Sequence, residues 1–132
     1  MIDTSKRYIL VVEDNCMITM ILQVTLENMG VTAVIAENGK IGIEKFLNYV
    51  QQGYFIFYLT LTFSYRCLFE MIIMDILMPV MGGYDATKEI RKIEDQYKVA
   101  REDRHFICGF SADVSAGKLK LSIINACIIV TT

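Results

Sequence analysis

A chain of 132 residues is long enough to bury the core of one domain, and we expect residues 1–132 to form a single unit. Its formal net charge of −2 gives no general attraction to nucleic acid or to an anionic membrane, so neither direct nucleic-acid binding nor membrane association is expected. Hydrophobic residues make up 54% of the composition, which is high for a small domain and has a local source in one segment of the chain.

The cysteines are scattered, and none has the spacing of a metal or redox motif. The polar start of the chain, Met1–Arg7, lacks the apolar stretch of a secretory signal. Both features predict free thiols in a reducing compartment, so we expect the protein in the cytoplasm or the nucleus. The four residues are Cys16, Cys67, Cys108 and Cys127.

The first strand is predicted over Tyr8–Val12, a short apolar run with β-branched residues that ends directly at Glu13 and Asp14. From about Asn15 to Met29, apolar residues then recur every three or four positions, which predicts an amphipathic helix. Gly30 stands where such a helix would end. We expect the methionines of this helix to fill the core, since methionine at helical spacing is typical of core packing. They are Met17, Met20 and Met29.

A second strand and a second helix follow. Val31–Ala36 is rich in β-forming residues, and the turn Glu37–Gly39 begins a helix that includes Phe46 and Leu47. Alternation of strands and helices is typical of a parallel sheet with right-handed crossovers, so the fold class is α/β.

The connection after the second helix is much longer than the few residues usual there. Within it, residues 54–64 alternate in a period of two, which favours a strand, and polar residues interrupt the run too often for a membrane span. Three interpretations stay open for this atypical apolar insertion at about residues 51–69. It is an added edge strand or hairpin, a flap that faces a membrane or partner, or translated noncoding sequence. The third interpretation rests on the residues of the segment, which are those with uridine-rich codons.

The third strand carries a single carboxylate. Four apolar residues, Met71–Met74, precede Asp75, which suits a strand covered on both faces, and Pro79 and Gly82 then end the strand and open a loop. In an open parallel sheet, ligands bind beyond the carboxyl ends of the strands. If the first and third strands are neighbours, Glu13, Asp14 and Asp75 converge at one edge and repel one another. All-oxygen ligands with room for water suit Mg²⁺, with Mn²⁺ as the alternative.

A third helix is predicted from about Tyr84, with Ile90 on its apolar side and charged residues, including Glu94, largely outside. The charged stretch Asp95–Arg104 reads as a solvated loop or a frayed helix end. His105 stands alone beside it, and we expect a surface or strand-start histidine rather than a phosphohistidine.

The last third of the chain predicts a fourth strand over Phe106–Phe110 that ends at Ser111, on the same edge as the acidic residues. The Ser111 hydroxyl can donate to and accept from an anion, or it can cap a helix from Ala112 onward. A fourth helix is expected there, followed by a fifth strand over Cys127–Thr131.

Three stretches, Ile9–Asn15, Met74–Gly83 and Phe110–Ala112, resemble in order and rough spacing the three signature blocks of the receiver domain of two-component response regulators. The resemblance covers about residues 7–49 and 70–131, and its middle block is highly specific. It implies a flavodoxin-like doubly wound parallel sheet with strand order 2-1-3-4-5.

The same resemblance implies the roles of the site residues. Asp75 would accept a phosphoryl group, and the Ser111 hydroxyl would contact the phosphoryl oxygens. Glu13, Asp14, Asp75 and the backbone carbonyl of Leu77 would bind Mg²⁺. The donor would be a phosphohistidine on a histidine phosphotransfer protein or a histidine kinase. The activity implied is at most self-phosphorylation with weak autophosphatase activity, not kinase activity.

The chain departs from the receiver pattern at its end. The family has a lysine and a proline after the fifth strand and then a final helix, and we expect these to be missing here. Lys118 and Lys120 lie ahead of that strand, so they are not assigned the lysine's role. Val130 stands near the position of the family's switch aromatic residue. Without the ammonium group, the phosphoryl group loses a cationic partner.

Two alternative functions follow from these departures and from the fold. The chain could be a degenerate receiver, acting as a binding module that does not switch or as a nonproductive splice form. A flavodoxin-like binder of nucleotide or flavin shares the strand pattern, but no glycine-rich phosphate loop follows the first strand.

Overall fold

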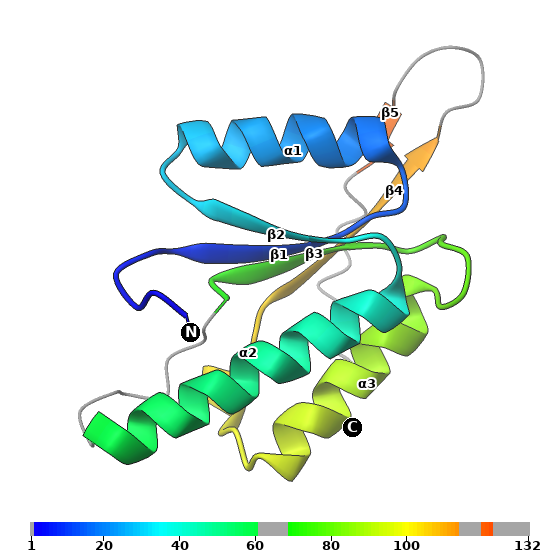
Figure 1. Ribbon diagram of the computed structural model, residues 1–132. Helices are drawn as coiled ribbons and strands as arrows, with labels where there is room; N and C mark the ends of the chain where they lie inside the picture. The colour runs from blue at the N-terminus through cyan, green and yellow to red at the C-terminus, as the bar shows by residue number, and fades with distance from the viewer. Residues whose placement is uncertain (1, 61–68, 114–119, 123–132) are drawn as a thin grey trace.

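The computed structural model describes residues 2–60, 69–113 and 120–122. Strands and helices alternate along most of it, as Figure 1 shows. In chain order the elements are β1 (Tyr8–Val12), α1 (Cys16–Asn28), β2 (Thr32–Ala36), α2 (Gly39–Thr60), β3 (Met71–Asp75), α3 (Gly83–Gln96), the short 3₁₀ helix η1 (Arg101–Asp103), β4 (Ile107–Asp113) and β5 (Lys120–Ser122).

The five strands form one sheet in the order β2-β1-β3-β4-β5. The first four strands in this order are parallel, and β5 is antiparallel to β4. Helix α1 lies on one face of the sheet, and α2 and α3 lie on the other (Figure 1). The α/β class expected from the alternating pattern is therefore confirmed, and so is the flavodoxin-like order implied by the resemblance, for strands 2-1-3-4.

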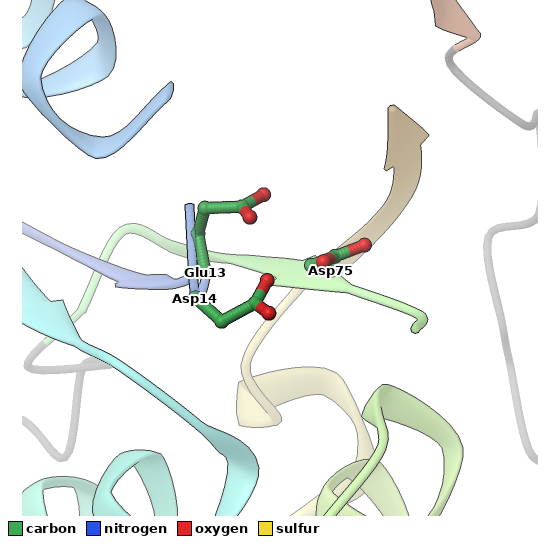
Figure 2. A group of neighbouring side chains, drawn as sticks. All are labelled: Glu13, Asp14 and Asp75. Atoms are coloured by element: carbon green, nitrogen blue, oxygen red, sulfur yellow. The ribbon is translucent and has the colours of Figure 1, made fainter. Parts of the chain in front are cut away.

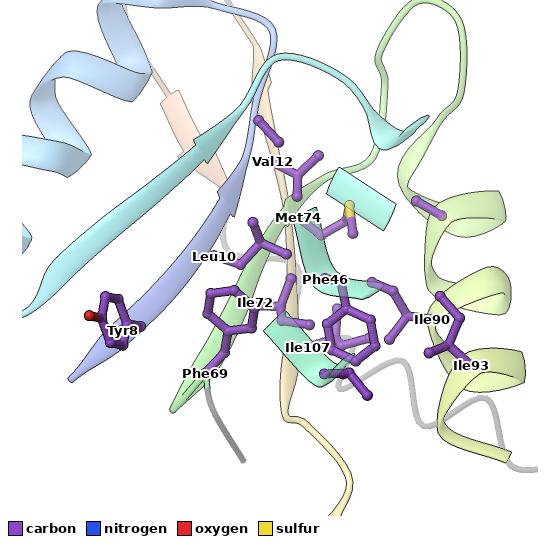
Figure 3. Packing of buried hydrophobic residues seen from close by; sticks show 13 residues of the cluster. Tyr8, Leu10, Val12, Phe46, Phe69, Ile72, Met74, Ile90, Ile93 and Ile107 are labelled. Atoms are coloured by element: carbon purple, nitrogen blue, oxygen red, sulfur yellow. The ribbon is translucent and has the colours of Figure 1, made fainter. Parts of the chain in front are cut away.

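The core has one large part and one small part because the sheet is covered on both faces. Alternate residues of β1 and β3 point toward α2 and α3, where Phe46 lies at the centre of the packing (Figure 3). The other residues of β1 pack under α1 with Leu26 and Val31. Each fully buried apolar side chain of this size stabilises the fold by about 1.5–3 kcal/mol relative to exposure.

Helix α2 corrects the strand predicted over residues 54–64, because the chain is helical through Thr60. Phe46, Val50 and Gly53 are buried at spacings of four and three residues, so one helical face continues into the insertion. Tyr54 then packs on Tyr97, with ring centroids 4.7 Å apart, and its hydroxyl donates a hydrogen bond to the Tyr97 carbonyl oxygen. These tertiary contacts stabilise the helix more than the alternating sequence pattern favours a strand. Residues 61–68 lie outside the described residues.

The end of the described chain corrects a second prediction. Strand β4 continues through Asp113, and Lys120–Ser122 forms β5, so the helix expected from Ala112 is wrong at these positions. The pairs Ser111 with Ser122 and Asp113 with Lys120 join the two strands, so strand pairing satisfies backbone groups that a helix would otherwise satisfy. The fifth strand expected over Cys127–Thr131 lies outside the described residues.

The prediction that the methionines of α1 fill the core is wrong. Met17, Met20 and Met29 are 70%, 65% and 67% exposed, because α1 packs on the sheet only through the face that carries Ile18 and Leu26. In the part of the chain that the structure describes, no helix has both the length and the apolar character needed to cross a membrane.

Glu94 and His105 are buried, so the outer position expected for Glu94 is wrong, and of the two positions expected for His105 the structure has the one at the start of a strand, just before β4, and not the surface. The Glu94 carboxylate accepts hydrogen bonds from the His105 backbone N–H at 2.9 Å and from Arg91 at 2.7 Å, and it lies 3.0 Å from His105 Nδ1. Burial disfavours this carboxylate, but the hydrogen bonds from His105 and Arg91 outweigh it and lower the pKa of Glu94. The cluster ties the end of α3 to the start of β4.

Candidate functional site

Glu13 is the first residue after β1, and its side chain is only 2% exposed. Its backbone N–H donates to the Ala36 carbonyl oxygen at 3.0 Å, which ties it to the end of β2. Glu13 Oε1 accepts a hydrogen bond from the Asn15 N–H at 2.9 Å. Asn15 Oδ1 in turn accepts from the Met17 and Ile18 N–H groups and caps α1. The start of α1 therefore fixes the loop that carries Glu13 and Asp14.

Asp75 is the last residue of β3 and is 6% exposed. The Leu77 N–H donates to Asp75 Oδ1 at 3.4 Å. The loop that follows is closed by a hydrogen bond of 3.0 Å from the Gly83 N–H to the Ile76 carbonyl oxygen. A Cβ at Gly83 would overlap the Asp75 carbonyl oxygen, so only glycine lets α3 begin this close to the phosphoacceptor candidate.

The three carboxylates converge because β1 and β3 are neighbours in parallel register, with Val12 opposite Met74. One oxygen from each of Glu13, Asp14 and Asp75 lies within 4.8 Å of the others, and Figure 2 shows the carboxylates gathered at the sheet edge. They open into a pocket of about 540 Å³. Its lining residues are Glu13, Asp14, Asn15, Cys16, Met17, Ile18, Asp75 and Leu77.

This geometry disfavours the ionised forms of two of the acids. The pKa of Glu13 is raised to about 7, first by burial and then by the negative charges of Asp75 and Asp14, against the opposing hydrogen bond from Asn15. The pKa of Asp75 is also raised, first by burial and then by the charge of Asp14, although the Leu77 N–H opposes the shift. A bound cation would favour the ionised form of both groups.

The donor set fits a small hard cation. All three side chains offer oxygen, and Glu13 Oε2 is buried without a hydrogen-bond partner in the described parts of the chain. Such an oxygen is costly to bury unless something satisfies it. Mg²⁺ is bound in proteins by one or two carboxylates together with several waters, and an open pocket lined with three acids meets that need.

The structure brings some of the predicted site residues together and leaves others as predictions. Glu13, Asp14 and Asp75 meet as expected. The Leu77 side chain points to solvent, with 76% exposed, while its backbone N–H faces Asp75; metal binding by its carbonyl stays a prediction. Ser111 follows Phe110, which is paired with Asp75, so its backbone lies near the same edge. The role of its hydroxyl also stays a prediction.

Sequence reasoning missed the supporting role of Asn15. An asparagine directly before an amphipathic helix is a signal for an N-cap, and that signal could have shown that this residue fixes the acidic loop. The contact between Gly83 and the Asp75 backbone had no such signal, because it joins the end of a strand to the start of a helix through space.

Comparisons with known proteins show which family and which solved structures the chain resembles. Residues 9–101 match the family described as the response regulator receiver domain. The response regulator sskA of Aspergillus fumigatus is 33% identical over 86 residues, which is 65% of this chain and 8% of sskA. The chain therefore spans less than a tenth of the length of this curated relative.

Two solved structures share the fold. The receiver domain of the histidine kinase CKI1 from Arabidopsis thaliana, in complex with Mg²⁺ and BeF₃⁻, has a TM-score of 0.66 and 31% identity, over 80% of this chain and 65% of that one. The co-crystal structure of the Saccharomyces cerevisiae histidine phosphotransfer protein Ypd1 with the receiver domain of Ssk1 has a TM-score of 0.57 and 25% identity, over 83% of this chain and 66% of that one.

Proposed function

This chain belongs to the response regulator receiver domain family, and on that premise we propose that Asp75 accepts a phosphoryl group from a phosphohistidine in a two-component phosphorelay. The observation that carries the proposal is the meeting of three carboxylates within 4.8 Å around a pocket, with a buried Glu13 oxygen that has no hydrogen-bond partner among the described residues. This is the arrangement that phosphoryl transfer to a carboxylate requires, because the reaction depends mainly on alignment and charge neutralisation.

In the proposed reaction, an Asp75 carboxylate oxygen attacks the phosphorus atom in line with the bond to the histidine nitrogen. The O–P bond forms as the N–P bond breaks, and the imidazole leaves with the electron pair of that bond. The Leu77 N–H, which donates to Asp75 Oδ1, holds the carboxylate in place. Ser111 lies next to the residue paired with Asp75, and in the proposal its hydroxyl contacts a phosphoryl oxygen.

We assign the metal site to Glu13, Asp14, Asp75 and the Leu77 carbonyl. The bound ion, Mg²⁺ with Mn²⁺ as the alternative, would neutralise the charge that the acids and the phosphoryl oxygens bring together. Glu13 is held by the Asn15 N–H through one oxygen, so its free oxygen is the one available to a metal-bound water. Support for Mg²⁺ comes from the CKI1 receiver, which was crystallised with it.

The proposed donor is a histidine phosphotransfer protein or a histidine kinase. The Ssk1 receiver forms a complex with the phosphotransfer protein Ypd1, and the CKI1 receiver is part of a histidine kinase. The proposal includes a cytoplasmic or nuclear location. Among the described residues, the thiols of Cys16 and Cys108 are free, as is usual in a reducing compartment.

The test is transfer of a radiolabelled phosphoryl group from a phosphorylated histidine phosphotransfer protein, with Mg²⁺ or with EDTA. We expect label on the wild type only with Mg²⁺, and no label on Asp75→Asn. Glu44→Gln, which removes an exposed acid of α2, serves as the control and should be labelled like the wild type. Binding of the partner without any transfer would instead favour the non-switching binding module.

A further inference from the structure

The first turn of α2 packs against two segments that lead to the acidic residues, the end of β1 and the β3–α3 loop. It packs beside the end of β1 through Gly42 and beside the β3–α3 loop through Gly39. We propose that Gly39 is a positioning residue for the acidic pocket, which sets the distance between the β3–α3 loop and the Glu13–Asp14 loop. The inference rests on the function proposed above and adds a residue that lies outside the pocket.

Gly39 leaves no room for a side chain. A Cβ at this position would lie 2.7 Å from the Met81 carbonyl oxygen and 3.0 Å from the Ala86 Cβ. The first of these is a backbone atom, so it cannot rotate away as the end of a flexible side chain can. Gly39 does not have a positive φ, unlike Gly30, so this glycine is required for space and not for its backbone conformation.

The close approach allows a direct hydrogen bond. The Gly39 N–H donates to the Met81 carbonyl oxygen at 3.2 Å. This N–H is in the first turn of α2, where backbone donors have no partner within the helix. Asn38 holds the turn in place, because its side-chain oxygen accepts from the Ile41 N–H at 3.0 Å. The β3–α3 loop is thus bonded to a capped and fixed helix end.

A shift of Met81 would move the rest of its loop, including the part that contacts Asp75. The Met81 N–H donates to the Pro79 carbonyl oxygen at 2.8 Å, across Val80, whose φ is +69°. The whole loop from Ile76 to Gly83 is closed by the hydrogen bond from the Gly83 N–H to the Ile76 carbonyl oxygen. A short loop bonded at both ends moves as a unit, and it contains the Leu77 N–H that holds the Asp75 carboxylate.

The same turn of α2 also packs against the end of β1, which leads into the other acidic loop. A Cβ on Gly42 would lie 2.9 Å from Cγ2 of Val12, the residue before Glu13. The α2 turn therefore contacts the chain that leads to the pocket on both sides, at Val12 and at Met81. A methyl group at position 39 must push the β3–α3 loop away from α2, while Glu13 stays bonded to Ala36 and Asn15. The spacing of the three carboxylates then changes although none of them is altered.

The experiment compares Mg²⁺ affinity in Gly39→Ala, Gly30→Ala and the wild type by calorimetric titration, at a temperature where circular dichroism shows all three folded. Gly30 makes the control because the same methyl group meets nothing within 4 Å there and acts only through its φ of +76°. We expect Gly39→Ala to raise the Kd for Mg²⁺ by about tenfold, as loss of support behind metal ligands commonly does. Gly30→Ala should lower the unfolding temperature and leave the Kd unchanged.

A measurement on the wild type covers the case in which Gly39→Ala does not fold. Coupling between two sites is reciprocal, so Mg²⁺ should slow hydrogen exchange at the Gly39 amide and not at the Gly30 amide. Equal Mg²⁺ affinity in folded Gly39→Ala and the wild type, or Gly39 exchange that ignores Mg²⁺, would overturn the inference alone. A wild type that binds no Mg²⁺ would overturn the proposed function, and this inference with it.

Discussion

Replacing Asp75 by asparagine should stabilise the metal-free protein, although it removes the proposed reacting group. Asparagine keeps the shape of the side chain and removes one of three negative charges whose oxygens lie within 4.8 Å of one another. Two unit charges 4.8 Å apart repel by about 3.5 kcal/mol at an effective dielectric constant of 20, which gives the scale of one pairwise repulsion.

The pKa of Glu13 gives a second estimate of how much Asp75→Asn gains in stability. A value of about 7 against an ordinary 4.5 corresponds to about 3 kcal/mol, and burial is the largest cause of the shift, so the charge of Asp75 accounts for only part of it. Asp75 is itself buried, and its neutral replacement removes that cost as well. We expect Asp75→Asn to be about 1.5 kcal/mol more stable than the wild type at pH 8 in EDTA.

The gain should depend on pH. The folded protein holds the Glu13 proton more tightly than the unfolded chain, so this residue makes the wild type less stable as the pH rises from about 4.5 to about 7. In Asp75→Asn the pKa of Glu13 lies closer to its ordinary value, and the decline is smaller. The difference between the two proteins is therefore largest at pH 8 and shrinks below pH 7.

Urea unfolding followed by circular dichroism, at pH 8 and pH 5.5 in EDTA, measures the effect. Glu44→Gln removes an exposed charge elsewhere and should change the free energy of unfolding by less than about 0.5 kcal/mol. The reasoning would be refuted by an Asp75→Asn protein that is no more stable than the wild type at pH 8, or by a gain equally large at pH 5.5. Adding Mg²⁺ should reverse the order, because only the wild type keeps all three ligands.

Three other predictions concern the scaffold. Glu94→Gln should lower the free energy of unfolding by about 3 kcal/mol at pH 7, because it removes the buried carboxylate that pairs with Arg91 and accepts the His105 backbone N–H. The loss should shrink as the pH falls below about 4.5, because the pKa of Glu94 is lowered in the folded protein and protonation of the carboxylate then removes its stabilising effect; urea titrations at pH 7 and below pH 4.5 check it. Val80→Gly should raise stability by about 1 kcal/mol, since relief of a positive φ in a β-branched residue outweighs the added freedom of the unfolded chain, and a lower unfolding temperature would contradict this. Tyr54→Phe should cost about 1 kcal/mol through the lost hydrogen bond to the Tyr97 carbonyl, and an unchanged unfolding temperature would show that this end of α2 does not stabilise the domain.

The sequence predicts the acidic edge well because the relevant signals are local. Apolar runs that end at Glu13 and Asp75 define two strands, and parallel pairing of those strands brings their ends to one edge. The convergence of the three carboxylates follows from that pairing alone. The sequence does not predict how Asn15 and Gly39 support the acidic residues, because that support depends on where α1 and α2 begin relative to neighbouring loops.

The errors arose where tertiary contacts decide between two local patterns. The alternation after Tyr54 favours a strand, yet packing of Tyr54 on Tyr97 continues a helix there. The charge of Glu94 predicts an exposed position, but the residue lies four positions after Ile90 and so on the buried face of α3. Its burial depends on His105, which is brought to it by the fold and not by proximity in the sequence.

The most direct test of the central claim is to locate the phosphoryl group itself. The wild-type protein is incubated with acetyl phosphate and Mg²⁺, reduced with borohydride so that an aspartyl phosphate becomes homoserine, and mapped by peptide mass spectrometry. The convergence of Glu13, Asp14 and Asp75 predicts conversion at Asp75 alone, and none when EDTA replaces Mg²⁺. Conversion at another residue, or conversion at Asp75 that does not need a divalent cation, would contradict it.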